Sequence, residues 1–299
     1  MKDVSHIPVL SQAVLDSLAP GPGQSVLDCT AGQGGHGELL IPRLGPGGRY
    51  LALDLDPANV AFTHSRLEGL AKEHQVQLDV RQSNFAAARS VLAGECVDMI
   101  LADLGFASNQ MDDPTRGLAF GREGPLDMRL DPHLPMTAAH LVNDLGQDEL
   151  ANLIYQFGEE RLSRRIARKI VEQRAQSPIQ TTAELARIVR HAYGPRAGGS
   201  RIDPATRTFM ALRIVVNGEL DALDQLLADL PDLLAMSGRV GIISFHSLED
   251  RRVKRSFLER QQAGRFERIT RKPITADDDE ARTNPRSRSA KLRVARKVT

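Results

Sequence analysis

The chain has 299 residues, a formal net charge of +1 and 41% hydrophobic residues. This length and composition suit one large domain, or one domain that carries an insertion, with a sizeable core. No apolar run approaches the roughly 18 residues that suggest a membrane-spanning helix. The segment Met1–His6 lacks the apolar centre of a secretion signal, and the two cysteines lie in or beside apolar segments. These features predict a cytoplasmic protein with reduced thiols and no membrane association.

Charge is distributed unevenly along the chain. From Arg251 onward there are 16 basic and 6 acidic residues, whereas residues 1–250 hold 23 basic and 32 acidic residues. A basic carboxyl-terminal part suggests a polyanionic partner, although a solvated tail would have the same composition. The eight histidines are scattered without metal-ligand spacing, so no metal site is predicted.

The amino-terminal third alternates between strand-like and helical patterns. Strands are predicted at 25–28, 49–54, 76–81 and 96–103, and helices at 9–18, 38–44 and 57–73. This alternation predicts an α/β fold with a doubly wound, mostly parallel, Rossmann-like sheet.

Only helical patterns follow from 109 to 203. One helix is predicted at Ala138–Phe157, and a second carries an apolar stripe that includes Leu162 and Ile166. A capping box, Thr181-x-x-Glu184, begins a third helix, which ends near Gly194 and is followed by a loop to Ser200. We therefore predict an all-helical domain at 109–203, which recognises the substrate and is inserted into an α/β domain formed by 1–108 and 204–299.

The remaining chain is predicted to complete the α/β domain. The pattern indicates helices at 204–216 and 220–235, a buried strand at 239–245 and a helix that ends near Gln262. Further strands are predicted at 266–274 and 291–298. Only the segment around 275–289 is expected to lack regular structure.

Three of the predicted strands end on an acidic residue. Asp28 precedes a loop with glycines at positions 32, 34, 35 and 37, Asp54 lies 19 residues after Gly35, and Asp103 precedes a long polar loop. Open α/β sheets bind ligands at these strand ends, and glycines let the backbone approach a ligand closely. A carboxylate at this spacing suits the hydroxyl groups of a ribose. The pattern indicates a nucleotide-like cofactor. It does not identify which one, because proteins that bind different cofactors share this loop. The alternative is a tight turn that binds no ligand.

Several blocks of this sequence resemble the bacterial small-subunit (16S) ribosomal RNA cytosine-N4 methyltransferases. The blocks are His6–Leu10, Gly32–His36, Asp103–Asp131, Asp203–Arg213 with Asn217, Ile243–Arg251 and Asn284–Ser289. The resemblance covers nearly the whole chain, and its most specific runs are Gly124–Arg129 and Ser244–Arg251. It implies a class I methyltransferase sheet, S-adenosylmethionine as methyl donor, and a decoding-centre cytidine of small-subunit RNA as substrate, with the assembled particle as the expected form.

The resemblance also implies roles for single residues around the cofactor. Gly34, Gly35 and His36 would lie along its amino-acid portion, and Asp54 at its ribose. Phe85 would cover the adenine, although the sequence alone favours a core aromatic there. The remaining cofactor contacts are Asp103 and Gln110, near the sulfonium.

Other residues carry the predicted chemistry and RNA contacts. Asp103 is the candidate catalytic residue, as an acceptor for a hydrogen on N4. His246, Arg286 and Arg288 are candidate substrate contacts, and the segment that starts at Arg286 is expected to be flexible enough to follow an RNA backbone. Structural roles are favoured for Arg207, Arg213 and Asp250.

The chain departs from the family pattern after Gly105. It has Phe106-Ala107-Ser108-Asn109 where Val-Ser-Ser-Pro is usual, which leaves the role of this segment open.

Two other classes of protein compete with this interpretation. A nicotinamide-dependent oxidoreductase would share the glycine loop and Asp54, but none of the three tyrosines begins the Tyr-x-x-x-Lys pair that such enzymes often use. A non-catalytic RNA-binding or ribosome-assembly protein would not need the glycine loop. The oligomeric state, a homodimer included, is left open by the sequence.

Overall fold

The computed structural model describes residues 8–194 and 202–299. The first two residues of the His6–Leu10 block and most of the predicted loop after Gly194 therefore lie outside the described residues. The chain divides into two compact units. The α/β unit ends at Gly105 and resumes at Leu220, and the helical unit comprises Phe106–Glu219.

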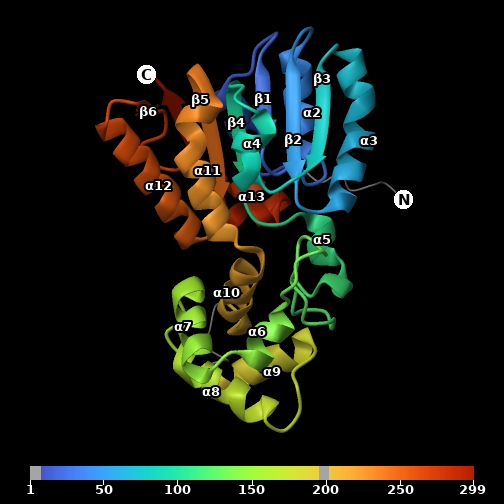
Figure 1. Cartoon of the computed structure of the whole chain (residues 1–299), viewed down its shortest axis with the longest axis vertical. Coiled ribbons are helices and arrows are strands. Elements are labelled where there is room, and N and C mark those ends of the chain that lie inside the picture. Colours follow the sequence, from blue (N-terminus) through green and yellow to red (C-terminus); the bar gives the residue numbers. More distant parts are fainter. Residues whose placement is uncertain (1–7, 195–201) are drawn as a thin grey trace. The chain divides into compact units, whose positions relative to one another are not determined.

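The α/β unit contains a seven-stranded sheet with the order β3-β2-β1-β4-β5-β7-β6 (Figure 1). The strands are β1 (Ser25–Asp28), β2 (Arg49–Asp54), β3 (Gln77–Gln82), β4 (Val97–Asp103), β5 (Leu234–Ser244), β6 (Phe266–Arg268) and β7 (Lys291–Lys297). The first five pair in parallel, whereas β7 is antiparallel to β5 and β6. This topology confirms the predicted doubly wound, mostly parallel sheet. The strand order reverses between β1 and β4, which is where such sheets bind ligands.

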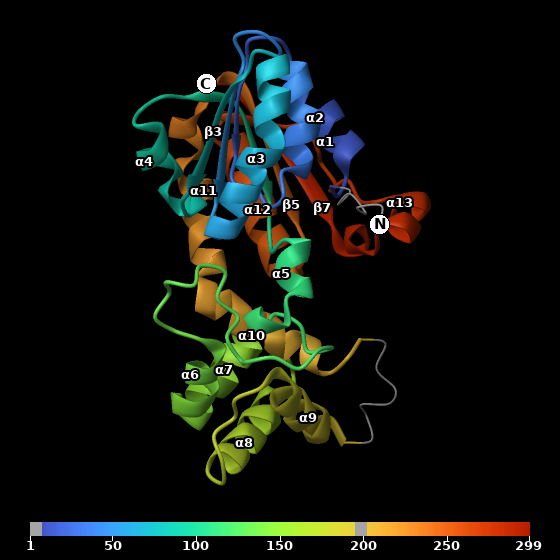
Figure 2. The same ribbon diagram turned by 90° about the vertical axis from the view of Figure 1, so that its right-hand side faces the viewer.

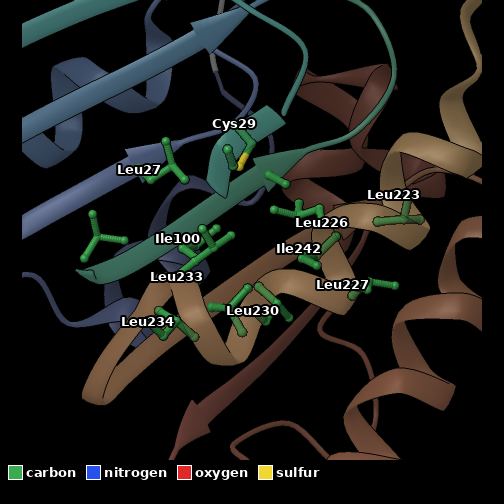
Figure 3. Packing of buried hydrophobic residues seen from close by; sticks show 14 of the residues in the cluster. Leu27, Cys29, Ile100, Leu223, Leu226, Leu227, Leu230, Leu233, Leu234 and Ile242 are labelled. Atoms are coloured by element: carbon green, nitrogen blue, oxygen red, sulfur yellow. The ribbon is translucent and has the colours of Figure 1, made fainter. Parts of the chain in front are cut away.

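Helices cover both faces of the sheet (Figure 2). One face packs against α1 (Ser11–Leu18), α2 (Gly35–Leu44) and α3 (Pro57–Glu73). The other face packs against α4 (Ala88–Leu92), α11 (Glu219–Leu233) and α12 (Ser247–Gln262). Strand side chains alternate between the two cores, because successive residues of a strand point to opposite faces. Figure 3 shows Leu27, Ile100 and Ile242 against the leucines of α11, each fully or almost fully buried. Burying a leucine side chain contributes about 1.5–3 kcal/mol, so this packing holds the strand ends in place.

The carboxyl-terminal part is more ordered than its sequence predicts. The expected loose segment contains α13 (Asp278–Thr283) and a 3₁₀ helix, η4 (Pro285–Ser289). The Asp277 side chain caps α13, and Glu280 accepts a hydrogen bond from the backbone of Leu10, 2.7 Å away. The expected strand at 266–274 is regular only over β6. The Asp277 cap is a local feature that the sequence prediction missed, whereas the contact between Glu280 and Leu10 joins residues 270 positions apart and could not be predicted from local sequence.

The helical unit consists of short helices without a strand in its described part. They are α5 (Ser108–Asp112), η2 (Pro114–Arg116), α6 (Ala138–Asp144), α7 (Gln147–Gly158), α8 (Ser163–Arg174), α9 (Thr182–Tyr193) and α10 (Ala205–Asn217). The prediction of one helix at 138–157 is wrong, because Leu145 takes an extended conformation and separates α6 from α7. The capping box of α9 is present, with Thr181 accepting from the Glu184 backbone at 3.2 Å.

The helical unit extends beyond the predicted boundary at residue 203. Helix α10 belongs to it, because α10 packs against α7 so closely that a Cβ on Gly158 would lie 2.6 Å from the Arg207 carbonyl oxygen. Within the described residues, no helix is both long enough and apolar enough to cross a membrane.

Candidate active site at the strand ends of the α/β unit

The loop between β1 and α2 is fixed to both neighbouring strands. The backbone N–H of Cys29 donates to Leu101 of β4, and that of Ala31 donates to Leu53 of β2, both at 2.8 Å. Gly34 precedes α2 with φ +78°, a left-handed conformation that favours glycine. The loop therefore presents the amino terminus of α2 at the switch point of the sheet, a position suited to a ligand.

Gly37 has a different purpose from the one that its sequence position predicts. A Cβ there would lie 2.5 Å from Leu67 of α3 and 2.9 Å from the Tyr50 hydroxyl. This glycine is needed for close packing of α2 on the protein's own core, rather than for access of a ligand.

Asp54 holds the glycine loop at the end of β2. Its carboxylate accepts from the backbone N–H groups of Gly32 and Asp56, both at 2.8 Å, and from the Asn59 amide at 3.2 Å. A carboxylate offers about four acceptor sites, so room remains for a ligand hydroxyl. Burial raises the pKa of Asp54 to about 6, and these hydrogen bonds oppose the shift. Asp54 can therefore be partly protonated under mildly acidic conditions.

Phe85 lies just beyond β3, in the 3₁₀ turn η1 (Phe85–Ala87). Ser83 donates to the Asp54 carbonyl oxygen at 3.0 Å, which places this turn beside the end of β2. The ring is half-buried and packs at the margin of the core that contains Leu27 and Leu53. Phe85 therefore makes the core contact that the sequence favours. Part of its ring stays exposed, where a planar ligand could cover it.

Asp103 ends β4 and faces His36 in the first turn of α2. Asp103 Oδ2 lies 3.7 Å from His36 Nε2, and the two side chains are 24% and 7% exposed. Among the described residues, neither His36 Nε2 nor the other carboxylate oxygen, Asp103 Oδ1, has a hydrogen-bond partner. Buried polar atoms are normally paired, so two unpaired ones at this strand end indicate a place for a polar ligand.

A partly buried chain of hydrogen bonds fixes the backbone of Asp103. Its N–H donates to the Thr30 hydroxyl at 2.7 Å, and the Thr30 N–H donates to Asp28 Oδ1 at 3.0 Å. The Tyr50 hydroxyl donates to Asp28 Oδ2 at 2.5 Å. Burial raises the pKa of Asp28, with the Tyr50 hydrogen bond opposing that shift. Sequence reasoning missed Thr30 and Tyr50, although a hydroxyl two residues after a strand end was a visible signal.

Comparison with known proteins supports a methyltransferase site. Residues 3–298 match the model of the MraW methylase family. The chain belongs to the MraW methylase family. A ribosomal RNA small subunit methyltransferase H from Koribacter versatilis is 48% identical over 99% of this chain and 95% of its own length. A protein of the same name from Acidobacterium capsulatum is 46% identical over 99% of this chain and 100% of its own length. Another from Synechococcus sp. CC9902 is 49% identical over 100% of this chain and 99% of its own length.

Family membership confirms two predictions made from the sequence. The protein is a methyltransferase, and S-adenosylmethionine is its methyl donor. The α/β unit fits this cofactor, because it offers an acidic side chain at β2, free N–H groups at α2 and an unpaired carboxylate oxygen on Asp103. The oxidoreductase and the non-catalytic RNA-binding protein are not favoured.

Gln110 lies in the helical unit, where its side chain has a structural contact. It is buried within α5, and its Oε1 accepts from the Ala107 N–H at 2.9 Å. In the atypical segment after Gly105, Phe106 lies under the Arg213 guanidinium, 4.7 Å from ring centroid to Cζ. Arg213 in turn forms a bidentate pair with Glu219 at 2.7 and 2.9 Å. Phe106 therefore has a packing role within the helical unit.

His246 caps the helix that follows β5. Its Nδ1 accepts from the Glu249 N–H at 3.4 Å, and Glu249 Oε2 accepts from the N–H groups of Phe245 and His246 at 2.8 and 3.2 Å. The sequence left a structural and a substrate role open, and this capping box supplies the structural one. A substrate contact by His246 stays a prediction.

The two candidate arginines of the carboxyl-terminal part lie in η4. Arg288 is exposed and donates to the Ala281 carbonyl oxygen at 3.1 Å, and Arg286 is half-buried. The segment does not lack regular structure as expected, because both arginines lie in η4 and Ser287 between them is 1% exposed. Their contact with RNA stays a prediction.

Proposed function

We propose that this methylase transfers the methyl group of S-adenosylmethionine to the exocyclic N4 of a cytidine in the decoding centre of small-subunit ribosomal RNA. The names of its relatives and the family match support ribosomal RNA of the small subunit as substrate. The observation that carries the chemistry is the buried, unpaired Oδ1 of Asp103 at the switch point of the sheet. The target base would have to be unpaired or flipped out of its stack to reach this position.

Asp103 would act as the acceptor for a hydrogen on N4. Bound S-adenosylmethionine supplies a methyl group activated by its sulfonium. The N4 lone pair is delocalised into the ring, so positive charge builds on the nitrogen as the new C–N bond forms. A fixed carboxylate beside that nitrogen stabilises the charge and orients the lone pair, and the extra N4 proton then leaves to water.

The cofactor contacts in this proposal come mainly from the α/β unit. Gly34, Gly35 and His36 would line the amino-acid portion, Asp54 would accept from the ribose and Phe85 would cover the adenine. Gln110 remains a proposed contact from the helical unit. The free N–H groups at the start of α2 and the remaining acceptor site of Asp54 support these assignments.

The helical unit offers a surface suited to an RNA backbone. Ile166 and Ile170 of α8 are buried, and the opposite face of this helix and the preceding turn carries Arg161, Arg164, Arg165 and Arg168, all exposed. Among the described residues, the first three of these arginines have no ion-pair partner, whereas Arg168 lies 3.8 Å from Glu172. Unpaired arginines can contact phosphates without first breaking an internal pair. We assign substrate recognition to this face, with Arg286, Arg288 and His246 as further candidate contacts.

A methyl-transfer assay with two substrates tests the proposal. The protein is incubated with labelled S-adenosylmethionine and either assembled small subunits from a strain that lacks the enzyme or the free RNA, and the methylated base is then mapped. N4-methylcytidine in the decoding centre, formed faster on assembled subunits, is the expected result. Methylation at another atom, or none by a folded protein that binds the cofactor, would contradict it.

A further inference from the structure

His36 and Asp103 lie close to each other but do not form a hydrogen bond, which suggests that the bond forms only when ligands are bound. The 3.7 Å between His36 Nε2 and Asp103 Oδ2 exceeds hydrogen-bond distance, although both atoms lie in a site with little exposure. His36 Nε2 has no other partner among the described residues. A buried imidazole nitrogen without a partner is costly, so its position near the carboxylate requires an explanation.

The backbone on both sides of this contact is held in place. The N–H of Asp103 is bound to Thr30, and the next N–H, of Leu104, donates to Ile243 of β5 at 3.0 Å. On the other side, α2 is packed so closely at Gly37 that a single Cβ would clash. The remaining freedom is therefore the rotation of the two side chains. A shift of less than about 1 Å would form a hydrogen bond, and catalytic hydrogen bonds often tighten only when ligands are bound.

We propose that His36 is a positioning residue for Asp103. With cofactor and base in place, His36 Nε2–H donates to one carboxylate oxygen of Asp103 and leaves the other as the atom that accepts the N4 hydrogen. This division assigns each carboxylate oxygen one partner and prevents the carboxylate from rotating away from the nitrogen. The inference rests on the proposed role of Asp103 and adds a function to His36 besides contact with the cofactor.

A positioning role for His36 predicts how the effects of substituting His36 and Asp103 combine. If His36 acts on methyl transfer only through Asp103, its removal has no further effect once Asp103 can no longer act as a charged acceptor. If His36 serves only to bind the cofactor, its removal weakens cofactor binding by the same factor whether or not Asp103 is intact. A double-mutant cycle separates the two cases.

The experiment measures single-turnover methyl transfer to small subunits at saturating S-adenosylmethionine, with cofactor affinity measured separately by calorimetry. The variants are His36→Ala, Asp103→Asn and the double mutant, with His64→Ala, an exposed histidine of α3, as the matched control. We expect His36→Ala to slow transfer by about tenfold or more, and the double mutant to be no slower than Asp103→Asn. His36→Gln, whose amide N–H can replace Nε2–H, should recover part of the rate and covers the case in which the alanine variant does not fold.

A spectroscopic readout complements the kinetics. The Nε2 resonance of ¹⁵N-labelled His36 should shift when the RNA substrate joins the cofactor-bound wild-type protein, and should shift less in Asp103→Asn. Rate losses that multiply in the double mutant, or a His36→Ala defect confined to cofactor affinity, would overturn the inference. A wild-type rate for Asp103→Asn would instead remove the catalytic role proposed for Asp103, so the two failures are distinguishable.

Discussion

The strand-end site and the basic carboxyl-terminal part differ in whether their polar groups have hydrogen-bond or ion-pair partners within the protein. At the site, His36 Nε2 and Asp103 Oδ1 have no partner among the described residues. In the carboxyl-terminal part, several cations are already paired within the protein. Arg293 and Lys291 contact Asp250, Arg296 contacts Glu267, and Lys297 donates to the carbonyl oxygens of Pro231 and Leu234.

This contrast shows that an excess of charge is not the same as charge available for binding. The sequence predicts an RNA contact from the basic composition after Arg251, but several of those cations stabilise β7 instead. Available cations occur on α8, in a unit whose overall charge gives no such signal. We therefore expect substitutions of paired groups to affect stability and substitutions of unpaired groups to affect function.

The largest expected effect is on stability, from Asp250→Ala. Arg293 is buried at 6% exposure, and its bidentate pair with Asp250 holds the pKa of that carboxyl below its usual value, although burial opposes the shift. Removing Asp250 leaves a buried cation unpaired, which should cost about 3 kcal/mol. Urea unfolding should show this loss, with cofactor affinity preserved at low denaturant. Equal stability would show that the pairing of the carboxyl-terminal part is incidental.

Asp103→Asn should lower activity without lowering stability. The amide keeps the shape of the side chain but lacks the charge, so we expect single-turnover transfer to slow by about tenfold to a hundredfold. The midpoint of thermal unfolding should stay the same or rise, because an unpaired charge is removed. A large fall in the midpoint would mean that Asp103 is chiefly structural.

RNA binding compares the paired and unpaired cations directly. Replacing Arg161, Arg164 and Arg165 by Gln should flatten the dependence of log affinity on log salt by about 2 units, if two or three phosphates lose their contacts. Arg286→Ala with Arg288→Ala should flatten it by about 1 unit, because these residues already contact the protein. Replacing Arg271 and Lys272, exposed in the α/β unit, by Gln is the charge control. A wild-type slope in the α8 variant would remove this face from the proposed RNA contact.

The smallest effect is a pH dependence of cofactor affinity. Because the pKa of Asp54 is about 6, the ionised fraction that can accept from a ribose falls roughly fourfold between pH 7 and 5.5. Cofactor affinity should fall by about that factor, and Asp54→Asn should show weaker binding without this dependence. The stability of the protein should depend on pH in the opposite direction to cofactor affinity. A raised pKa means that the folded protein holds the proton more tightly, so the contribution of Asp54 to the free energy of unfolding declines as pH rises from about 4 through 6. Calorimetry across this range measures both.

Local sequence patterns predicted the elements of this protein well where the causes are local. The apolar runs at β1, β2 and β4, and the acidic residue that ends each of them, place Asp28, Asp54 and Asp103 at one edge of the sheet without any knowledge of packing. The capping box of α9 depends on two residues three positions apart, so it too could be read directly. The same reasoning joined α6 and α7, because it contained no signal strong enough for the extended conformation of Leu145.

The sequence by itself determined the parallel α/β sheet, the glycine loop, the strand-end acids and, by resemblance, the family. Tertiary structure alone decided which polar groups are paired. Asp250 meets Arg293 across 43 residues, and Glu280 meets Leu10 across 270. The order of 275–289, the packing role of Gly37 and the incomplete contact of His36 with Asp103 were decided in the same way. The physical reason is that a hydrogen bond or ion pair depends on distance in space, and chain folding sets that distance independently of separation in sequence.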